Sequence, residues 1–186
     1  MSKELSQEFI NNFYKAESLF KENNFLDSLK IYESLLKENP EHVSVLNNIG
    51  LIYERLKKLD KAKILYKKCN TIIPNQIEIL HNLANVYFKL KEYKEALPIL
   101  QKIINPNFKY EVNCEKIAQC LFVIQTKKET KKFIDSVLPK FPNNKLLNIL
   151  LGKSLLHLNL HSRGLEYIQK NEGIIEFSES GVKYFQ

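Results

Sequence analysis

Apolar residues recur at spacings of three and four along most of the chain, and short polar stretches such as Lys57-Lys58 and Lys91-Glu92 separate the apolar runs. Spacings of three and four place side chains on one face of an α-helix. The pattern therefore predicts a series of amphipathic helices joined by tight turns. The 186 residues include only five Gly and six Pro, which disfavours long irregular loops and a β-sandwich. We expect an all-α fold.

The helical pattern itself repeats along the chain. Pro40, Pro74 and Pro142 are separated by 34 and 68 residues, which is one period and then two. A proline cannot continue a helix and restricts the residue before it, so each would end the second helix of a unit. The period predicts five repeats followed by a tail at 173–186. The repeats are 9–42, 43–76, 77–110, 111–144 and 145–172.

Small residues recur at two fixed slots of this repeat. The eighth slot is small and, in the later units, follows a large apolar residue; its occupants are Ala16, Gly50, Ala84, Ala118 and Gly152. The twentieth slot is small in four units, as Ser28, Ala62, Ala96 and Gly164, and holds Thr130 in the fourth. Small residues let two helix backbones approach, while larger neighbours fill the groove beside the contact. A single helix pair cannot bury both its faces, so we expect neighbouring pairs to stack.

The joint pattern of period and slots resembles the tetratricopeptide repeat family over about residues 9–172. The match is best in the second and third units, LNNIGLIYERLKKLDKAKILYKKCNTIIP and LHNLANVYFKLKEYKEALPIL. The chain departs from the family pattern by having no Trp, and by having Lys127 where an aromatic residue or Leu is typical. The resemblance implies a right-handed superhelical solenoid of helix-turn-helix repeats. The first helix of each repeat would line a concave groove that holds an extended peptide or a partner's helix.

The predicted groove has two parts of different chemistry. The phase opposite the core slots gives an amide-rich lining in the second and third units, formed by Asn47, Asn48, His81, Asn82 and Asn85. Asn side chains both donate and accept, so they can hold a peptide backbone, although they can equally cap local backbone or stay hydrated. Asn48 and Asn82 lie one period apart, which predicts a small amide ladder. Towards the C-terminus the expected lining is apolar, with Phe122, Ile149 and Leu150.

The segment from Leu146 to Leu158 is apolar nearly all round, and such helices are normally covered on every side. A partner protein, a second copy or the chain's own tail would supply the cover, so homo-oligomerisation through the fifth repeat is one hypothesis. The tail contains two apolar runs, IIEF and VKYF, around a Ser-Glu-Ser-Gly turn. This pattern predicts a β-hairpin or an extended strap, which either caps the solenoid or docks on a partner.

Composition adds little chemistry to this fold. The net charge is +7, but nearly all the cations are Lys, and only Arg55 and Arg163 offer the planar fork typical of nucleic-acid recognition. Three Cys without a C-x-x-C pair predict neither a disulfide framework nor a zinc site. His157 and His161 are four apart, but His161 is expected in a turn and no further ligand completes a metal site near them. No signal peptide or membrane span is expected, which favours a cytoplasmic location.

These observations predict a protein-protein interaction module, an adaptor or scaffold with a protein or peptide ligand. No catalytic motif or cofactor-binding loop is recognisable, so we do not expect an enzyme. The alternative is an accessory or substrate-recruiting segment of a bacterial transferase or oxygenase-type system. The basic side chains that the family uses to hold chaperone C-terminal tails have no counterparts at the matching positions, which disfavours that ligand.

Overall fold

The computed structural model describes residues 6–104, 110–172, 175–178 and 181–184. The chain divides into two compact units, Met1–Glu92 and Tyr93–Gln186. The first contains α1 (Gln7–Lys21), α2 (Phe25–Glu38), α3 (Val43–Arg55), α4 (Leu59–Ile72) and α5 (Ile77–Lys89). The second contains α6 (Tyr93–Ile103), α7 (Tyr110–Ile124), α8 (Lys127–Val137), the short 3₁₀ helix η1 (Leu138–Lys140), α9 (Lys145–His157), α10 (His161–Glu172), β1 (Ile175–Ser178) and β2 (Gly181–Tyr184).

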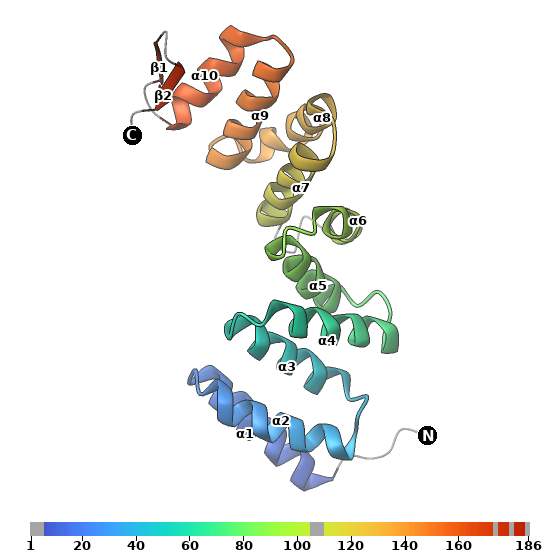
Figure 1. Cartoon of the computed structure of the whole chain (residues 1–186). Coiled ribbons are helices and arrows are strands. Elements are labelled where there is room, and N and C mark those ends of the chain that lie inside the picture. Colours follow the sequence, from blue (N-terminus) through green and yellow to red (C-terminus); the bar gives the residue numbers. More distant parts are fainter. Residues whose placement is uncertain (1–5, 105–109, 173–174, 179–180, 185–186) are drawn as a thin grey trace. The chain divides into compact units, whose positions relative to one another are not determined.

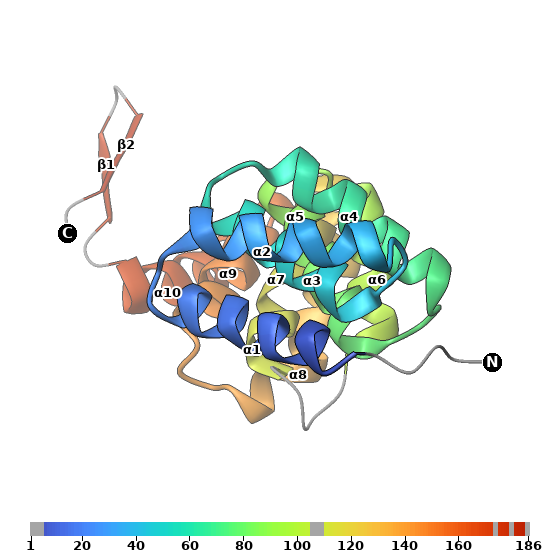
Figure 2. The same ribbon diagram turned by 90° about the horizontal axis from the view of Figure 1, so that it is seen from below.

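The helices of the first unit pack in chain order, with α1 beside α2 and α3 beside α4 (Figures 1 and 2). Their apolar stripes meet in one core cluster in which α1, α2 and α3 all take part; its buried members are Phe9, Ala16, Tyr32, Leu35, Val45, Ile49 and Ile52. A second cluster of Leu46, Cys69 and Ile79 joins α3, α4 and α5. Each helix therefore buries its apolar face against its neighbours, as the stacking argument requires.

The small residues lie where the paired helices approach each other, which confirms that part of the prediction. A Cβ atom on Gly50 would lie 2.5 Å from the ring of Tyr66 on α4. The hydroxyl of Ser28 on α2 donates to the carbonyl of Ala16 on α1 at 2.7 Å. Both contacts leave room only for a very small side chain. The hydroxyl of Ser28 is buried at the helix crossing, and its bond to Ala16 satisfies its hydrogen-bonding capacity as a donor.

Four of the turns between paired helices share one backbone conformation. Asn23, Lys57, Lys91 and Asn159 all have a positive φ, between 59° and 62°. In the second repeat the amide of Lys58 donates to the carbonyl of Tyr53 at 2.8 Å, and the amide of Lys57 donates to Glu54 at 3.1 Å. This is the Schellman arrangement, which satisfies the last carbonyls of a helix and reverses the chain. Polar residues fill these turns because the backbone is exposed there.

The apolar helix α9 is covered by helices of its own unit. It packs against α7, α8 and α10. Leu147, Leu150, Leu151 and Leu155 belong to the main core cluster of this unit. Its buried Ser154 donates to the carbonyl of Leu150 at 2.7 Å. The expectation that a partner, a second copy or the tail must cover α9 is therefore wrong, because three neighbouring helices already surround it.

The second helix of the fourth repeat region ends in a short 3₁₀ helix. Thr126 and Glu129 form a capping box at the start of α8, which ends at Val137 and continues into η1.

Helix α10 begins at His161, whereas the sequence pattern predicts this residue in the preceding turn. Helices α3, α5 and α9 begin at Val43, Ile77 and Lys145, where three predicted repeats begin. The division of the chain into five repeats as a domain assignment stays a prediction.

The tail forms a two-stranded antiparallel hairpin in the part that the structure describes. The register pairs Ile175 with Tyr184, Glu176 with Lys183, and Phe177 with Val182. Residues 173–174, 179–180 and 185–186 lie outside the described residues. Whether the hairpin caps the solenoid or docks on a partner therefore stays a prediction.

Candidate functional site

The predicted amide-rich surface lies on α3 and α5 of the first unit, and its amides are joined in an unexpected way. Asn82 donates to the side-chain oxygen of Asn47 at 3.0 Å, which links the two first helices. Asn48 instead donates to the hydroxyl of Tyr32 on α2 at 2.9 Å. Neither bond joins Asn48 to Asn82, and the amide ladder that the sequence indicates stays a prediction. Consecutive helical residues differ by about 100° in direction, so Asn47 faces α5 while Asn48 faces α2.

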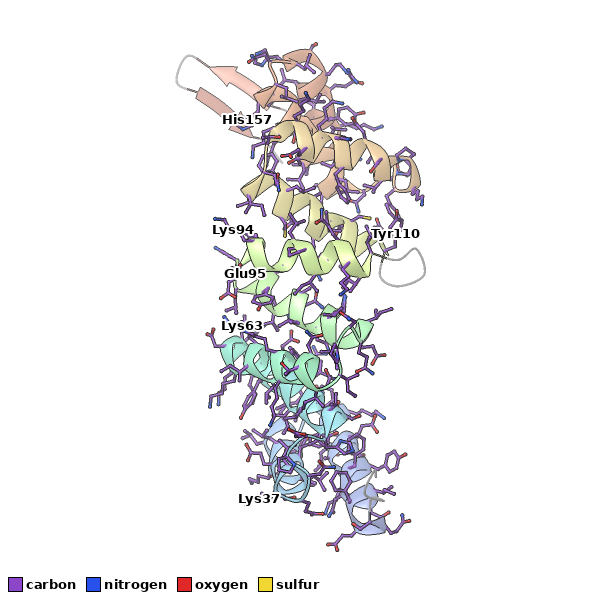
Figure 3. The ribbon with its side chains drawn as sticks, turned by 90° about the vertical axis from the view of Figure 1, so that its right-hand side faces the viewer. Lys37, Lys63, Lys94, Glu95, Tyr110 and His157 are labelled. Carbon is purple, nitrogen blue, oxygen red and sulfur yellow. The ribbon has the colours of Figure 1, made fainter. Side chains whose placement is uncertain are left out.

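The other predicted lining residues differ in how deeply they are buried. Asn85 is half-buried on α5, whereas His81 is buried with 3% of its surface exposed. In the second unit Phe122 is half-buried and contacts Lys127 and His157. His157 is labelled in Figure 3. Ile149 and Leu150 are buried, each with 8% exposed, and Leu150 belongs to the core cluster. Buried side chains offer little surface to a ligand, so we do not propose His81, Ile149 or Leu150 as contact residues.

Charged and polar side chains also link α3, α4 and α5 of the first unit. Tyr66 on α4 donates to Glu54 on α3 at 2.9 Å, and Lys89 on α5 pairs with the other oxygen of Glu54 at 2.5 Å. Lys63 on α4 (Figure 3) pairs with Glu92 at 2.7 Å. Burial raises the pKa of Tyr66 well above its usual value, so its hydroxyl stays a donor. These groups hold α3, α4 and α5 in fixed positions.

A feature that the sequence pattern did not single out is the crease between α1 and α3. It contains two cavities, one of about 200 Å³ and one of about 170 Å³. The first is lined by Phe9, Ile10, Phe13, Tyr14, His42 and Ser44. The second is lined by Glu17, Phe20, Lys21, Tyr32, Asn48 and Leu51. The signal was present in the sequence, since Ile10, Phe13 and Tyr14 are apolar outside the core slots of the first helix.

His42 has a structural role at the edge of this crease. It precedes α3, and its Nδ1 accepts from the amide of Val45 at 3.3 Å, so it acts as the N-cap. Its ring lies 5.0 Å from the ring of Phe9. Partial burial lowers the pKa of His42, which keeps the ring neutral and Nδ1 able to accept. A neutral ring with Nδ1 as acceptor carries its proton on Nε2.

The described residues show little sign of reactive chemistry. Burial raises the pKa of Cys69, Cys114 and Cys120 to about 11, so these thiols stay protonated and unreactive. No cluster of three or more His, Cys, Asp or Glu side chains with the arrangement of a metal site occurs in the described ranges. Among the same residues, no helix combines the length and apolarity needed to cross a bilayer.

The stacked helix pairs, the small residues at their crossings and the repeated turn conformation define a helical-repeat protein. Two family models of the tetratricopeptide repeat match the chain, at residues 43–76 and 77–105. The first match has the bounds of the second predicted repeat, and the second match begins where the third predicted repeat begins. Residues 43–105 therefore contain tetratricopeptide repeats, and these repeats support a role as a protein-interaction scaffold.

Known proteins resemble the chain more in structure than in sequence. A segment of 41 residues is 49% identical to the uncharacterized protein ycf37 of Pyropia yezoensis, and the match covers 22% of this chain and 23% of that relative. The structure of YrrB, described as a TPR protein with an unusual peptide-binding site, has a TM-score of 0.77 at 19% identity and covers 86% of this chain and 82% of YrrB. The MamA protein has a TM-score of 0.77 at 17% identity, with coverage of 90% and 91%. MamA from Desulfovibrio magneticus RS-1 has a TM-score of 0.78 at 14% identity, with coverage of 90% and 94%. These structures share the fold.

Proposed function

We propose that the chain is an adaptor that holds a peptide of a partner protein against the first helices α1, α3 and α5. The observation that carries this proposal is the pair of half-buried amides Asn47 and Asn82, which are joined at 3.0 Å across α3 and α5. An Asn amide has two N–H donors and an oxygen that accepts twice, so one bond leaves further capacity for a peptide backbone. YrrB supports the proposal as a protein of the same fold whose description names a peptide-binding site.

The surrounding charges suit a surface that presents these amides in fixed positions. Glu54 on α3, the helix that carries Asn47, is paired with Tyr66 and Lys89, so its charge is balanced within the protein. A peptide backbone is uncharged and needs donors and acceptors rather than net charge. Fixed partners also reduce the side-chain entropy that would be lost on binding.

The test is affinity capture of partners by the wild-type chain and by a double variant, Asn47→Ala with Asn82→Ala. The matched control is Asn11→Ala, which removes an exposed amide of α1 that accepts a hydrogen bond from Gln7. We expect the control to capture the same partners as the wild type and the double variant to lose them. Equal partner lists for all three proteins would refute the amide surface as the binding site.

The second hypothesis, an accessory or substrate-recruiting segment of a transferase or oxygenase-type enzyme system, concerns the partner rather than the surface. A catalytic domain encoded beside this chain, and its capture by the wild-type protein, would support it. Homo-oligomerisation through the fifth repeat stays a hypothesis too, but the cover that α7, α8 and α10 give to α9 removes its original reason.

A further inference from the structure

The first cavity of the α1–α3 crease is lined largely by aromatic rings. Helix α1 supplies the rings of Phe9, Phe13 and Tyr14. His42, which precedes α3, supplies a fourth ring. The volume of about 200 Å³ lies below the ~300–1,000 Å³ of sites that hold whole drug-sized molecules. The cavity is therefore of a size for one side chain or one head group rather than for a nucleotide or a similar cofactor.

The rings that line this cavity are inclined to one another rather than stacked. The rings of Phe13 and Tyr14 are close to perpendicular, at 85°, with 6.0 Å between their centroids. The ring of His42 is tilted by 48° to that of Phe13 and by 41° to that of Phe9. Rings inclined in this way can surround a compact group from several sides. Because the face of an aromatic ring carries negative potential, such a lining attracts a cation.

The lining contains no charged side chain that would compete with the rings. None of its residues is Lys, Arg, Asp or Glu, and partial burial lowers the pKa of His42, so its ring is neutral at neutral pH. The charged residues next to the lining in the chain, Glu8, Lys15 and Glu41, are all exposed, and solvent screens such charges. A cation in the cavity therefore meets neither a repelling charge nor a carboxylate in the lining, and its attraction depends on the rings.

The lining also offers few hydrogen-bond acceptors, which limits the kind of cation. Nδ1 of His42 already accepts from the amide of Val45 at 3.3 Å. Phe and Ile side chains have no acceptor, so the remaining side-chain acceptors are the hydroxyls of Tyr14 and Ser44. An ammonium has three N–H donors and a guanidinium five, and these donors lose their bonds to water on burial. A fully methylated ammonium keeps the charge without any N–H donor, so it suits this lining best.

We propose that this cavity binds a methylated ammonium group, carried either by a small quaternary ammonium compound or by a methylated lysine side chain. The ring faces attract its charge, and its methyl groups bury apolar surface against the same rings. The site goes beyond the proposed function, because neither Asn47 nor Asn82 belongs to its lining. Tyr14, with 64% of its surface exposed, is the ring that a ligand reaches most easily.

Three small probes that differ in charge and methylation test the site, each titrated into ¹⁵N-labelled protein at constant ionic strength. Choline carries a trimethylammonium group, neohexyl alcohol has the same shape without the charge, and ethanolamine has the charge without the methyl groups. We expect choline to shift amides at the start of α1 and to bind about threefold more tightly than either of the others. No binding of choline, or equal binding of neohexyl alcohol or ethanolamine, would overturn the proposal.

A peptide that carries one trimethyllysine separates the two sources of the head group. Tighter binding of this peptide than of choline would assign the site to a modified protein, whereas equal or weaker binding would assign it to the free compound. The same peptide with unmodified Lys is the control, and it should bind more weakly than the trimethyllysine peptide. Equal binding of the two peptides would contradict the preference for a methylated head group.

Variants of Tyr14 separate attraction by the ring from general apolar contact. Tyr14→Leu should weaken choline binding about threefold and leave the binding of neohexyl alcohol and the circular dichroism spectrum unchanged. Tyr14→Phe keeps the ring and should bind choline like the wild type, as should Leu26→Ala, an exposed position outside the cavity. Equal losses with Tyr14→Phe and Tyr14→Leu would refute attraction by the ring. Asn47→Ala with Asn82→Ala should bind choline normally, so this test is independent of the test of the proposed function.

Discussion

The contact between α9 and α10 allows a quantitative test of how the helix pairs are held. A Cβ atom on Gly164 would lie 2.9 Å from the carbonyl oxygen of Gly152 and 2.9 Å from the side chain of Leu156. The oxygen belongs to the backbone of a packed helix and cannot move without moving α9. We therefore expect Gly164→Ala to force the two helices apart.

The free energy of unfolding is expected to fall although Ala favours helix more than Gly. The gain in helix propensity is about 1 kcal/mol. Overpacking costs about 1–3 kcal/mol, and a backbone obstacle places this contact at the upper end. The net loss is about 2 kcal/mol, or about 4–8 °C in melting temperature for a chain of this size. Gly152→Ala should have a similar effect, because its Cβ would lie 2.6 Å from Ile168 and 2.8 Å from the oxygen of Gly164.

Urea unfolding followed by circular dichroism measures this loss, and amide exchange in α9 and α10 shows whether it is local. Gln169→Ala, at an exposed position of α10, is the control and should change the free energy of unfolding by less than about 0.5 kcal/mol. The double variant of both glycines should lose less than the sum of the two, because they share one contact. A Gly164→Ala protein as stable as the wild type would refute the reasoning.

Three further predictions concern the described residues. Because burial lowers the pKa of His42, the unfolded chain takes up a proton at this side chain at a higher pH than the native protein. The contribution of His42 to the free energy of unfolding should therefore be complete above about pH 6.5 and fall as the pH drops below it. His42→Asn should keep the N-cap of α3 and flatten this part of the plot of melting temperature against pH. The buried thiols of Cys69, Cys114 and Cys120 should react with a disulfide reagent at pH 8 only after the protein is denatured. Fast reaction of the native protein would contradict their burial. Lys57→Gly should raise the free energy of unfolding by about 0.5–1 kcal/mol in a thermal melt, because φ of Lys57 is 59° and Gly adopts a positive φ without steric cost. The control is Lys58→Gly, which should not stabilise the chain because residue 58 has no positive φ.

The candidate site was only partly predictable. Asn47, Asn48 and Asn82 lie at half-buried positions, and helical phase can place them on the outer side of their helices because direction around a helix depends on local spacing alone. The partner of each amide depends on how neighbouring helices cross, so the bonds of Asn82 to Asn47 and of Asn48 to Tyr32 could not be foreseen. The aromatic crease was missed because its cavities exist only between α1 and α3, two helices separated by α2.

The sequence by itself determined the helices, their turns and the small residues at their crossings. These features follow from interactions among residues close in the chain: apolar spacing, prolines after the helices, and turn residues such as Asn23 and Lys57 that reverse the chain. Only the tertiary structure decided what covers α9, which of the predicted lining residues are buried, and where cavities open. Those outcomes depend on packing between helices far apart in sequence, where a rotation of one residue, about 100°, turns a surface position into a core position.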